Sequence, residues 1–300
     1  MQQKNLITGS NGLLGQKLIQ FFSQQSDYNV IGCSRGENRI TSTDNFTYYN
    51  VDITDNNKFT EILHTEKPSI IINCAAMTNV DLCEEKKLEC EKINVDVVKN
   101  MVSFCIENNT KLIHLSTDFI FDGKNGFYKE EDIPNPVNYY GESKLKSEKI
   151  IKDNLTNYAI IRTILVYGTT ENTNRGNIVS WVKNNLEAGK KINVVNDQLR
   201  MPTLVDDLVK AIALILQKDA VGVFHISSIE LLSIYEIALL VANAYKLNSQ
   251  LITAIPSSKL NQKAKRPLKT GFNLQKSKSV LGFKPKSFKE QLLQFKEELK

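Results

Sequence analysis

The sequence predicts an α/β fold, with a doubly wound parallel sheet followed by a smaller C-terminal α/β lobe. Short apolar runs bounded by turn residues alternate with helical stretches over the first half of the chain, and this alternation is typical of a parallel sheet with helices on both faces. Residues 70–72 are successive isoleucines, as expected for a strand that helices cover on both sides. Beyond about residue 168 the alternation loosens, which predicts the second lobe.

In the first domain, expected over residues 1–167, each strand is a short apolar run that ends at turn residues. Strands are expected at residues 5–8, 28–33, 46–51, 69–74, 111–116 and 158–166. Helices occupy the longer stretches between these runs. They are expected at residues 12–23, 57–66, 86–108 and 140–152.

The second lobe, expected over residues 168–300, begins with a loop at 169–177. Its elements are expected in the order helix 178–188, strand 191–195, helix 205–217, strand 221–227, helix 234–245 and, after a basic linker, a last helix from residue 288. Some of these segments, at about 191–217, are expected to return to the first domain.

The composition excludes several classes of protein. Of the 300 residues, 41% are hydrophobic and 24% are charged, which is typical of a globular protein rather than a disordered one. The formal net charge of +5 is weak for this length. Because no nucleic-acid-binding motif accompanies it, no nucleic-acid partner is expected, whereas anionic small molecules fit the charge.

The sequence also predicts a location. Five cysteines without CxxC spacing and a polar N-terminus without a signal peptide indicate a reduced, cytoplasmic protein. No apolar run reaches the length that crosses a membrane, so no membrane association is expected. The histidines are scattered and have no metal-ligand spacing, so no metal site is assigned.

Three glycines follow the first strand directly, in the order Thr8-Gly9-Ser10-Asn11-Gly12-Leu13-Leu14-Gly15. A backbone without Cβ atoms turns tightly and approaches a pyrophosphate, whose charge then lies against the N-terminus of the following helix. A simple strand-to-helix turn is the alternative, but three glycines at this junction favour a Rossmann-type dinucleotide site. Cofactor contacts are expected from Gly9, Asn11, Gly12, Leu13, Leu14 and Gly15.

The residues after the second strand distinguish between the two nicotinamide dinucleotides. NAD is normally held there by a carboxylate that binds the ribose hydroxyls, and this chain reads Cys-Ser-Arg-Gly at 33–36 instead. Ser34 and Arg35 suit a 2′-phosphate, so NADP(H) is favoured over NAD(H). The alternative is that Arg35 is a solvated loop residue. Asp52 and Ile53, after the third strand, are expected beside the adenine.

Tyr140 and Lys144 lie four residues apart at the start of an expected helix, so they share one helix face. An ammonium beside a phenol lowers the pKa of the phenol from about 10 and lets the tyrosine exchange a proton. This spacing alone is no more than chance provides in a lysine-rich chain. Their position is informative, because Thr117 lies at the end of a strand whose carboxyl end faces the ligand crevice. Thr117 is expected to hydrogen-bond a carbonyl oxygen that Tyr140 protonates; otherwise Thr117 caps a turn and Tyr140 packs.

Several motifs together resemble one known family over nearly the whole chain. They are Thr8-Gly9-x-x-Gly12-x-x-Gly15, Asn73-Cys74-Ala75-Ala76-Met77-Thr78-Asn79-Val80-Asp81, Ser116-Thr117-Asp118-Phe119-Ile120-Phe121-Asp122-Gly123, Tyr140-Gly141-Glu142-Ser143-Lys144-Leu145, Arg162-Thr163, Asp197-Gln198 with Pro202-Thr203, and Arg266-Pro267. In these motifs the chain resembles the extended short-chain dehydrogenase/reductases and, among them, the dTDP-4-dehydrorhamnose reductases.

The resemblance implies an NADPH-dependent reduction of the 4-keto group of a nucleotide-activated 6-deoxysugar, with a substrate-binding C-terminal lobe. It implies that Tyr140 donates the proton, that Lys144 holds the cofactor ribose and that Thr117 orients the ketone. Arg266 would reach the substrate diphosphate. The residues implied to line the cofactor are Ala75, Ala76, Met77, Tyr140 and Lys144. Those implied to contact the substrate are Thr117, Asp118, Tyr140 and Arg266.

Two departures from the family pattern concern the substrate. The reductases commonly carry a Trp after Arg-Thr, where this chain has Ile164-Leu165, and the loss of the ring removes a stacking platform for the sugar. The Gly expected between Asp-Gln and Pro-Thr is replaced by Leu-Arg-Met at 199–201. Sugar-nucleotide 4,6-dehydratases carry a Glu where this chain has Phe119, so dehydration is not expected. The identity of the sugar stays open.

Two alternatives stand beside the reductase. A sugar-nucleotide epimerase retains NAD, and the missing acid after the second strand disfavours it. A nucleotide-binding regulatory subunit, similar to the reductase-like β subunit of methionine adenosyltransferase, uses the fold for association. The presence of Thr117, Tyr140 and Lys144 disfavours that reading. Relatives of this kind commonly form dimers, so a homodimer is an arrangement that the resemblance allows.

Overall fold

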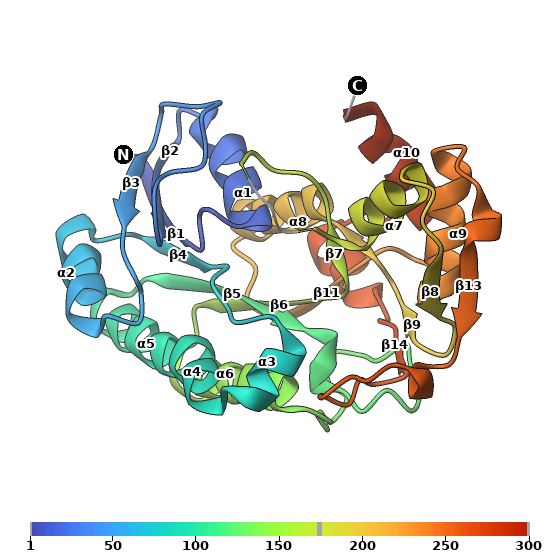
Figure 1. The fold of residues 1–300 in the computed structure, drawn as a ribbon. Coiled ribbons are helices and arrows are strands. Elements are labelled where there is room, and N and C mark those ends of the chain that lie inside the picture. The colour runs from blue at the N-terminus through green and yellow to red at the C-terminus, as the bar shows by residue number, and fades with distance from the viewer. Residues whose placement is uncertain (1, 173–175, 299–300) are drawn as a thin grey trace.

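The computed structural model describes residues 2–172 and 176–298. Its centre is a seven-stranded sheet in which every neighbouring pair of strands is parallel (Figure 1). Across the sheet the strands lie in the order β11 (Gly222–Ile226), β6 (Tyr158–Thr163), β5 (Lys111–Thr117), β4 (Ile70–Asn73), β1 (Gln3–Thr8), β2 (Tyr28–Ser34) and β3 (Thr47–Asn50). The predicted doubly wound parallel sheet is confirmed. Because the order reverses between β1 and β4, a ligand crevice is expected outside the carboxyl ends of these strands.

Helices cover both faces of this sheet (Figure 1). One face carries α1 (Leu13–Ser23) and α8 (Val205–Gln217), and the other carries α2 (Asn56–Glu66), α5 (Val97–Asn108) and α6 (Tyr139–Asn154). Neighbouring residues of a strand point to opposite faces. Ile7 therefore packs in the core with α1 and α8, whereas Leu6 packs in the core with α2 and α5.

The second lobe is a smaller α/β unit with its own apolar core. Its helices are α7 (Ile178–Glu187), α9 (Ile234–Ala244) and α10 (Phe288–Glu298). One small sheet pairs β8 (Ile192–Val195) with β13 (Ile252–Ile255). Another contains β12 (Leu232–Ser233), β9 (Leu199–Arg200) and β14 (Lys269–Thr270), and a third pairs β7 (Val166–Tyr167) with β10 (Thr203–Leu204).

Segments after residue 168 also belong to the first lobe. Within the expected returning segment 191–217, α8 shares a core with α1, whereas β8 pairs with β13 in the second lobe. β11 lies after that segment and extends the main sheet beside β6. The chain therefore crosses between the lobes more than once, which places residues of both lobes at their junction.

Two expected elements differ from the structure. The single strand expected at 158–166 is wrong, because Leu165 has a φ of +42°, a left-handed backbone that interrupts a strand. The helix expected at 86–108 begins as α4 (Lys87–Glu91), passes through a turn of π-helix, η1 (Lys92–Asp96), and continues as α5. The alternation of apolar runs also missed α3 (Val80–Glu85), whose N-terminus is capped by the Asn79 side chain accepting from the Leu82 N–H.

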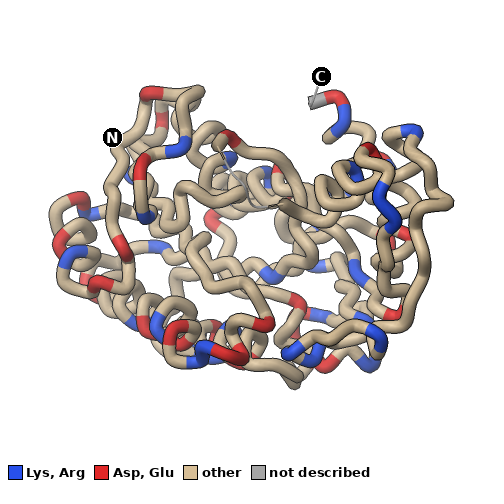
Figure 2. Tube along the Cα trace, viewed as in Figure 1, with Lys and Arg blue, Asp and Glu red and all other residues tan. Residues whose placement is uncertain are grey.

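Short helical turns complete the fold. They are η2 (Asp118–Ile120), η3 (Ser249–Leu251), η4 (Ser257–Lys259) and η5 (Ser277–Leu281). Figure 2 shows Lys and Arg interspersed with Asp and Glu along the helices on the α5–α6 face. Within residues 2–172 and 176–298, no helix is long and apolar enough to span a membrane.

Candidate active site

A cavity of about 970 Å³ lies where the carboxyl ends of the sheet strands meet the second lobe. Every residue that the sequence assigns to the site lines this cavity. These residues are Gly9, Asn11, Gly12, Leu13, Leu14, Gly15, Ser34, Arg35, Asp52, Ile53, Ala75, Ala76, Met77, Thr117, Asp118, Tyr140, Lys144 and Arg266. The structure thus brings the predicted cofactor and substrate contacts together, although their roles stay predictions.

The glycine loop forms one end of the cavity. Gly9 has a φ of +65°, and a Cβ on Gly15 would lie 2.3 Å from the Gly9 carbonyl oxygen. Side chains at these positions would therefore disrupt the tight turn between β1 and α1. Gly12 is the N-cap residue of α1, and among the described residues no side chain accepts a capping hydrogen bond from the N-terminus of this helix. The N–H groups of the first turn of α1 are thus left for an anion, and the loop fits a dinucleotide pyrophosphate.

The predicted ribose end is cationic and partly exposed. Ser34 ends β2, and the side chain of Arg35 is 74% exposed and lies 3.8 Å from Asp52 Oδ2. Asn11 Nδ2 donates to the carbonyl oxygen of Arg35, and Asn11 Oδ1 accepts from the N–H of Arg39. Asn11 therefore holds the loop that carries both arginines. Arg39, which the sequence analysis did not single out, also lines the cavity.

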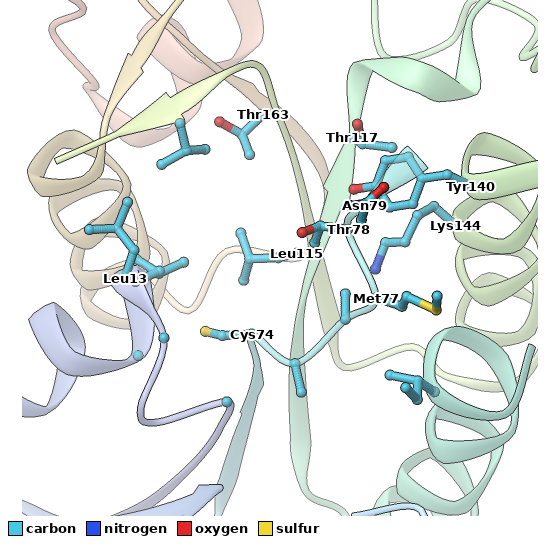
Figure 3. Close-up of a pocket in the computed structure, with 18 of the residues that line it drawn as sticks. Leu13, Cys74, Met77, Thr78, Asn79, Leu115, Thr117, Tyr140, Lys144 and Thr163 are labelled. Atoms are coloured by element: carbon cyan, nitrogen blue, oxygen red, sulfur yellow. The ribbon is translucent and has the colours of Figure 1, made fainter. Parts of the chain in front are cut away.

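The predicted catalytic residues lie at the other end of the cavity. Tyr140 and Lys144 are on the first turns of α6, and Thr117 is the last residue of β5. Figure 3 shows the three side chains pointing into the same region, across the cavity from Leu13. A Cβ on Gly141 would lie 2.1 Å from the Phe119 carbonyl oxygen. A glycine after Tyr140 therefore lets α6 approach the end of β5.

Burial dominates the electrostatics of Tyr140. Burial raises its pKa, a hydrogen bond with Thr117 lowers it, and the negative charge of Asp118 raises it. The expectation that Lys144 lowers the pKa of this phenol is therefore wrong for the net shift, because loss of solvent outweighs the favourable contacts. The phenol stays protonated at neutral pH, which suits a proton donor.

Lys144 is only 2% exposed. Burial lowers its pKa to about 8, against the opposing effect of Glu148. Its Nζ lies 3.0 Å from Nε2 of His114, and Nδ1 of His114 lies 3.0 Å from Nδ2 of Asn73. Burial and the charge of Lys144 hold the pKa of His114 well below its usual range, so the imidazole is neutral and available as a hydrogen-bond partner.

His114 was not predicted as a site residue, because nothing in the local sequence pattern separates it from an ordinary buried histidine. The only signal was its place on β5, three residues before Thr117. In the structure it lies beneath Lys144 and is fully buried.

Asp118 and Arg266 lie at the substrate end with protein partners already in place. The Thr117 hydroxyl donates to Asp118 Oδ1 at 3.1 Å, and Thr270 donates to Asp118 Oδ2. Arg266 makes a two-pronged ion pair with Asp81, at 3.0 and 2.7 Å. The Arg266 side chain is 17% exposed, so it is not part of a solvated linker and lies fixed at the edge of the cavity.

Within 2–172 and 176–298, no group of three or more His, Cys, Asp or Glu side chains is placed to hold a metal ion. The polar side chains that line the cavity include hydroxyls, amides, carboxylates and cations.

The chain is similar in sequence to two groups of known proteins. A family model described as the RmlD substrate binding domain matches residues 3–300. The dTDP-4-dehydrorhamnose reductase of Aggregatibacter actinomycetemcomitans is 30% identical, over 96% of this chain and 96% of that protein. Methionine adenosyltransferase 2 subunit beta of Bos taurus is 32% identical, over 84% of this chain and 75% of that protein.

Solved structures extend the similarity to the fold. The dTDP-4-dehydrorhamnose reductase of Bacillus anthracis in complex with NADP gives a TM-score of 0.87 at 27% identity and covers 99% of this chain and 100% of that chain. The UDP-glucose 4-epimerase of Thermotoga maritima gives 0.84 at 20% identity, over 99% and 100% of the two chains, and shows the fold alone. With the motifs, the cavity and the match over residues 3–300, the chain belongs to the dTDP-4-dehydrorhamnose reductase family of extended short-chain dehydrogenase/reductases, a family of NAD(P)-dependent oxidoreductases.

Proposed function

We propose that the protein uses NADPH to reduce the 4-keto group of a nucleotide-activated 6-deoxysugar. The observation that carries the proposal is the arrangement of one cavity, with Thr117, Tyr140 and Lys144 at one end and the loop 9–15 at the other. In this proposal the first lobe binds the cofactor, and the second lobe, mainly residues 168–300, closes over the sugar nucleotide.

The chain's own residues bind the cofactor, orient the ketone and protonate its oxygen. The loop 9–15 and the N-terminus of α1 hold the pyrophosphate, and Lys144 holds the ribose next to the nicotinamide. NADPH, when bound, supplies a hydride to C4 of the sugar. Thr117 orients the ketone, and Tyr140 gives its phenolic proton to the ketone oxygen, so that the ketone gains one hydride and one proton and becomes a secondary alcohol.

The preference for NADPH over NADH rests on the end of β2. No carboxylate occupies positions 33–36, and Arg35 and Arg39 both line the cavity there. Two guanidinium groups suit a 2′-phosphate through charge-assisted hydrogen bonds. The NADP complex of the B. anthracis reductase supports the same preference.

The function is tested by following NADPH oxidation by absorbance with dTDP-4-dehydro-6-deoxy-L-mannose generated in situ. NADH and the Tyr140→Phe protein serve as parallel controls. Turnover with NADPH that is lost in the variant supports the proposal. Failure of the wild type to oxidise NADPH with this substrate and with other 4-keto-6-deoxysugar nucleotides, despite measurable NADPH binding, contradicts it.

A second candidate function is a nucleotide-binding regulatory subunit. The observation that favours it is the 32% identity with methionine adenosyltransferase 2 subunit beta. This candidate predicts NADPH binding without ketone reduction, together with binding to a methionine adenosyltransferase catalytic subunit in a pull-down and sedimentation assay. Ketone reduction by the isolated chain would instead show that the site is catalytic.

A further inference from the structure

Arg200 lies at the substrate end of the cavity and has no role in the function proposed above. It belongs to β9 of the second lobe and is only 4% exposed. Its Nη1 donates to the carbonyl oxygens of Leu199 and Leu268 at 2.7 and 3.3 Å, and its Nη2 donates to that of Pro267 at 2.8 Å. Three backbone carbonyls therefore fix the guanidinium in place.

The fixed guanidinium contacts the turn that follows β5. Its Nε lies 3.6 Å from Asp118 Oδ2, and its Cζ lies 5.4 Å from the centre of the Phe119 ring, over its face. The first contact is a buried ion pair, and the second is a cation–π interaction. Arg200 thus holds the first two residues of η2, Asp118 and Phe119.

These two residues in turn hold the reacting side chains. Thr117 Oγ1 donates to Asp118 Oδ1 at 3.1 Å and accepts from the Phe119 N–H at 3.2 Å. The Phe119 ring meets the Tyr140 ring edge to face, with centroids 5.9 Å apart. A shift of η2 would therefore move the hydroxyl of Thr117 and the phenol of Tyr140 together.

The contacts with Asp118 also limit what its carboxylate can do. Oδ1 accepts from Thr117, and Oδ2 accepts from Thr270 and faces Arg200. Both oxygens are thus engaged by protein groups, from β5, β9 and β14. The carboxylate joins the second lobe to the end of β5, in addition to any contact with the sugar.

We propose that Arg200 is a positioning residue for the reduction, which acts from the second lobe through Asp118 and Phe119 to place Thr117 and Tyr140 against the substrate ketone. The inference rests on the proposed function and extends it. The family pattern has a glycine within the stretch 199–201, and a glycine makes none of these side-chain contacts. The contacts of Arg200 with Asp118 and Phe119 therefore fix the geometry at the ketone in this proposal.

The first test measures Arg200→Gln under single-turnover conditions, with NADPH and a 4-keto-6-deoxysugar nucleotide. We expect the rate of hydride transfer to fall about 10- to 100-fold, since a small displacement of reacting groups has an effect of this size. The KM and the affinity for NADPH should change less than about threefold. Arg200→Lys, which keeps the cation, should restore part of the rate.

A double-mutant cycle tests the route of the effect. Arg200→Gln combined with Asp118→Asn should be no slower than the slower single variant, because the two residues act through the same Thr117 hydroxyl. Lys183→Gln, which removes an exposed ion pair with Glu187 on α7, is the matched control and should leave the rate unchanged. An unchanged rate in Arg200→Gln, a change in KM alone, or fully multiplicative effects in the double variant would overturn the proposal.

A structural readout separates this inference from the proposed function. If the wild type reduces no ketosugar, the proposed function fails, and crystal structures of the wild type and Arg200→Gln with NADP decide the positioning role. The inference predicts that the Thr117 hydroxyl leaves Asp118 in the variant while the backbone of α6 stays in place. An unchanged Thr117–Asp118 hydrogen bond in the variant would contradict it.

Discussion

The cofactor end of the cavity is built from backbone, whereas the reacting end is built from buried side chains. At the cofactor end, the tight turn depends on Gly9 and Gly15, where added Cβ atoms would meet backbone atoms at 3.0 and 2.3 Å. At the reacting end, Thr117 and Lys144 are each held by a buried side chain, and Tyr140 packs against the half-buried Phe119 ring. The two ends should therefore respond differently to substitution, the first in cofactor affinity and the second in the rate of chemistry.

The largest expected effect is at the reacting end. Tyr140→Phe keeps the ring that packs against Phe119 but removes the proton donor, so turnover should fall by about 1,000-fold or more. Cofactor affinity should stay nearly unchanged, because the hydroxyl that is removed lies at the opposite end of the cavity from the loop that is expected to bind the pyrophosphate. Stopped-flow NADPH oxidation and a fluorescence titration of NADPH measure the two quantities. Equal activity of the variant would remove Tyr140 from the mechanism.

The next effect is at the cofactor end. Gly15→Ala places a Cβ 2.3 Å from the Gly9 carbonyl oxygen and 2.7 Å from Ser10 Cα, so the loop must move and the Kd for NADPH should rise about 100-fold. At saturating NADPH the rate should change far less. Gly176→Ala, whose added Cβ would lie 3.5 Å from its nearest neighbour, is the control. A Gly15→Ala protein that binds NADPH normally would contradict the claim that the cofactor end controls cofactor affinity.

A smaller effect should distinguish the two cofactors. Arg35→Ala removes an exposed cation beside Asp52, so the Kd for NADPH should rise about tenfold while the Kd for NADH stays the same. Isothermal titration with each cofactor measures this difference. Equal losses for NADPH and NADH would show that Arg35 holds the loop rather than the 2′-phosphate.

The smallest effect concerns pH at the reacting end. His114→Leu removes the partner 3.0 Å from Lys144 Nζ, so the charged form of Lys144 becomes less stable and its pKa falls below about 8. The alkaline limb of the kcat/KM profile should then move to lower pH by roughly one unit. His114→Gln keeps a polar partner and should move the limb less. A profile that does not shift would show that Lys144 titration does not limit activity.

The same contrast explains what the sequence could predict. The loop 9–15 and the pair Tyr140 and Lys144 are contiguous or share one helix, so their spacing already carries their geometry. The roles of Arg200 and His114 depend on contacts between segments distant in the sequence, β9 with η2 and β5 with α6. The left-handed Leu165 and the π-turn η1 were missed for a related reason, because tertiary packing can override local preference.

The pKa of Tyr140 shows a similar limit to what the sequence can predict. The distance along the helix correctly placed Lys144 near Tyr140, but the net pKa shift of Tyr140 is set by burial. Burial is a property of the whole fold, because residues from elements other than α6, among them Thr117 and Phe119, lie against the phenol. A pairwise argument from sequence therefore gave the wrong sign.

The central claim is that hydride reaches C4 of a ketosugar in this cavity. It is tested most directly by turnover with NADPH that carries deuterium at one or the other face of the nicotinamide C4, followed by NMR of the sugar product. The account predicts deuterium at C4 of the sugar from one labelled face, none from the other, and none in the Tyr140→Phe protein. Absence of deuterium at C4 with both labelled cofactors would contradict it.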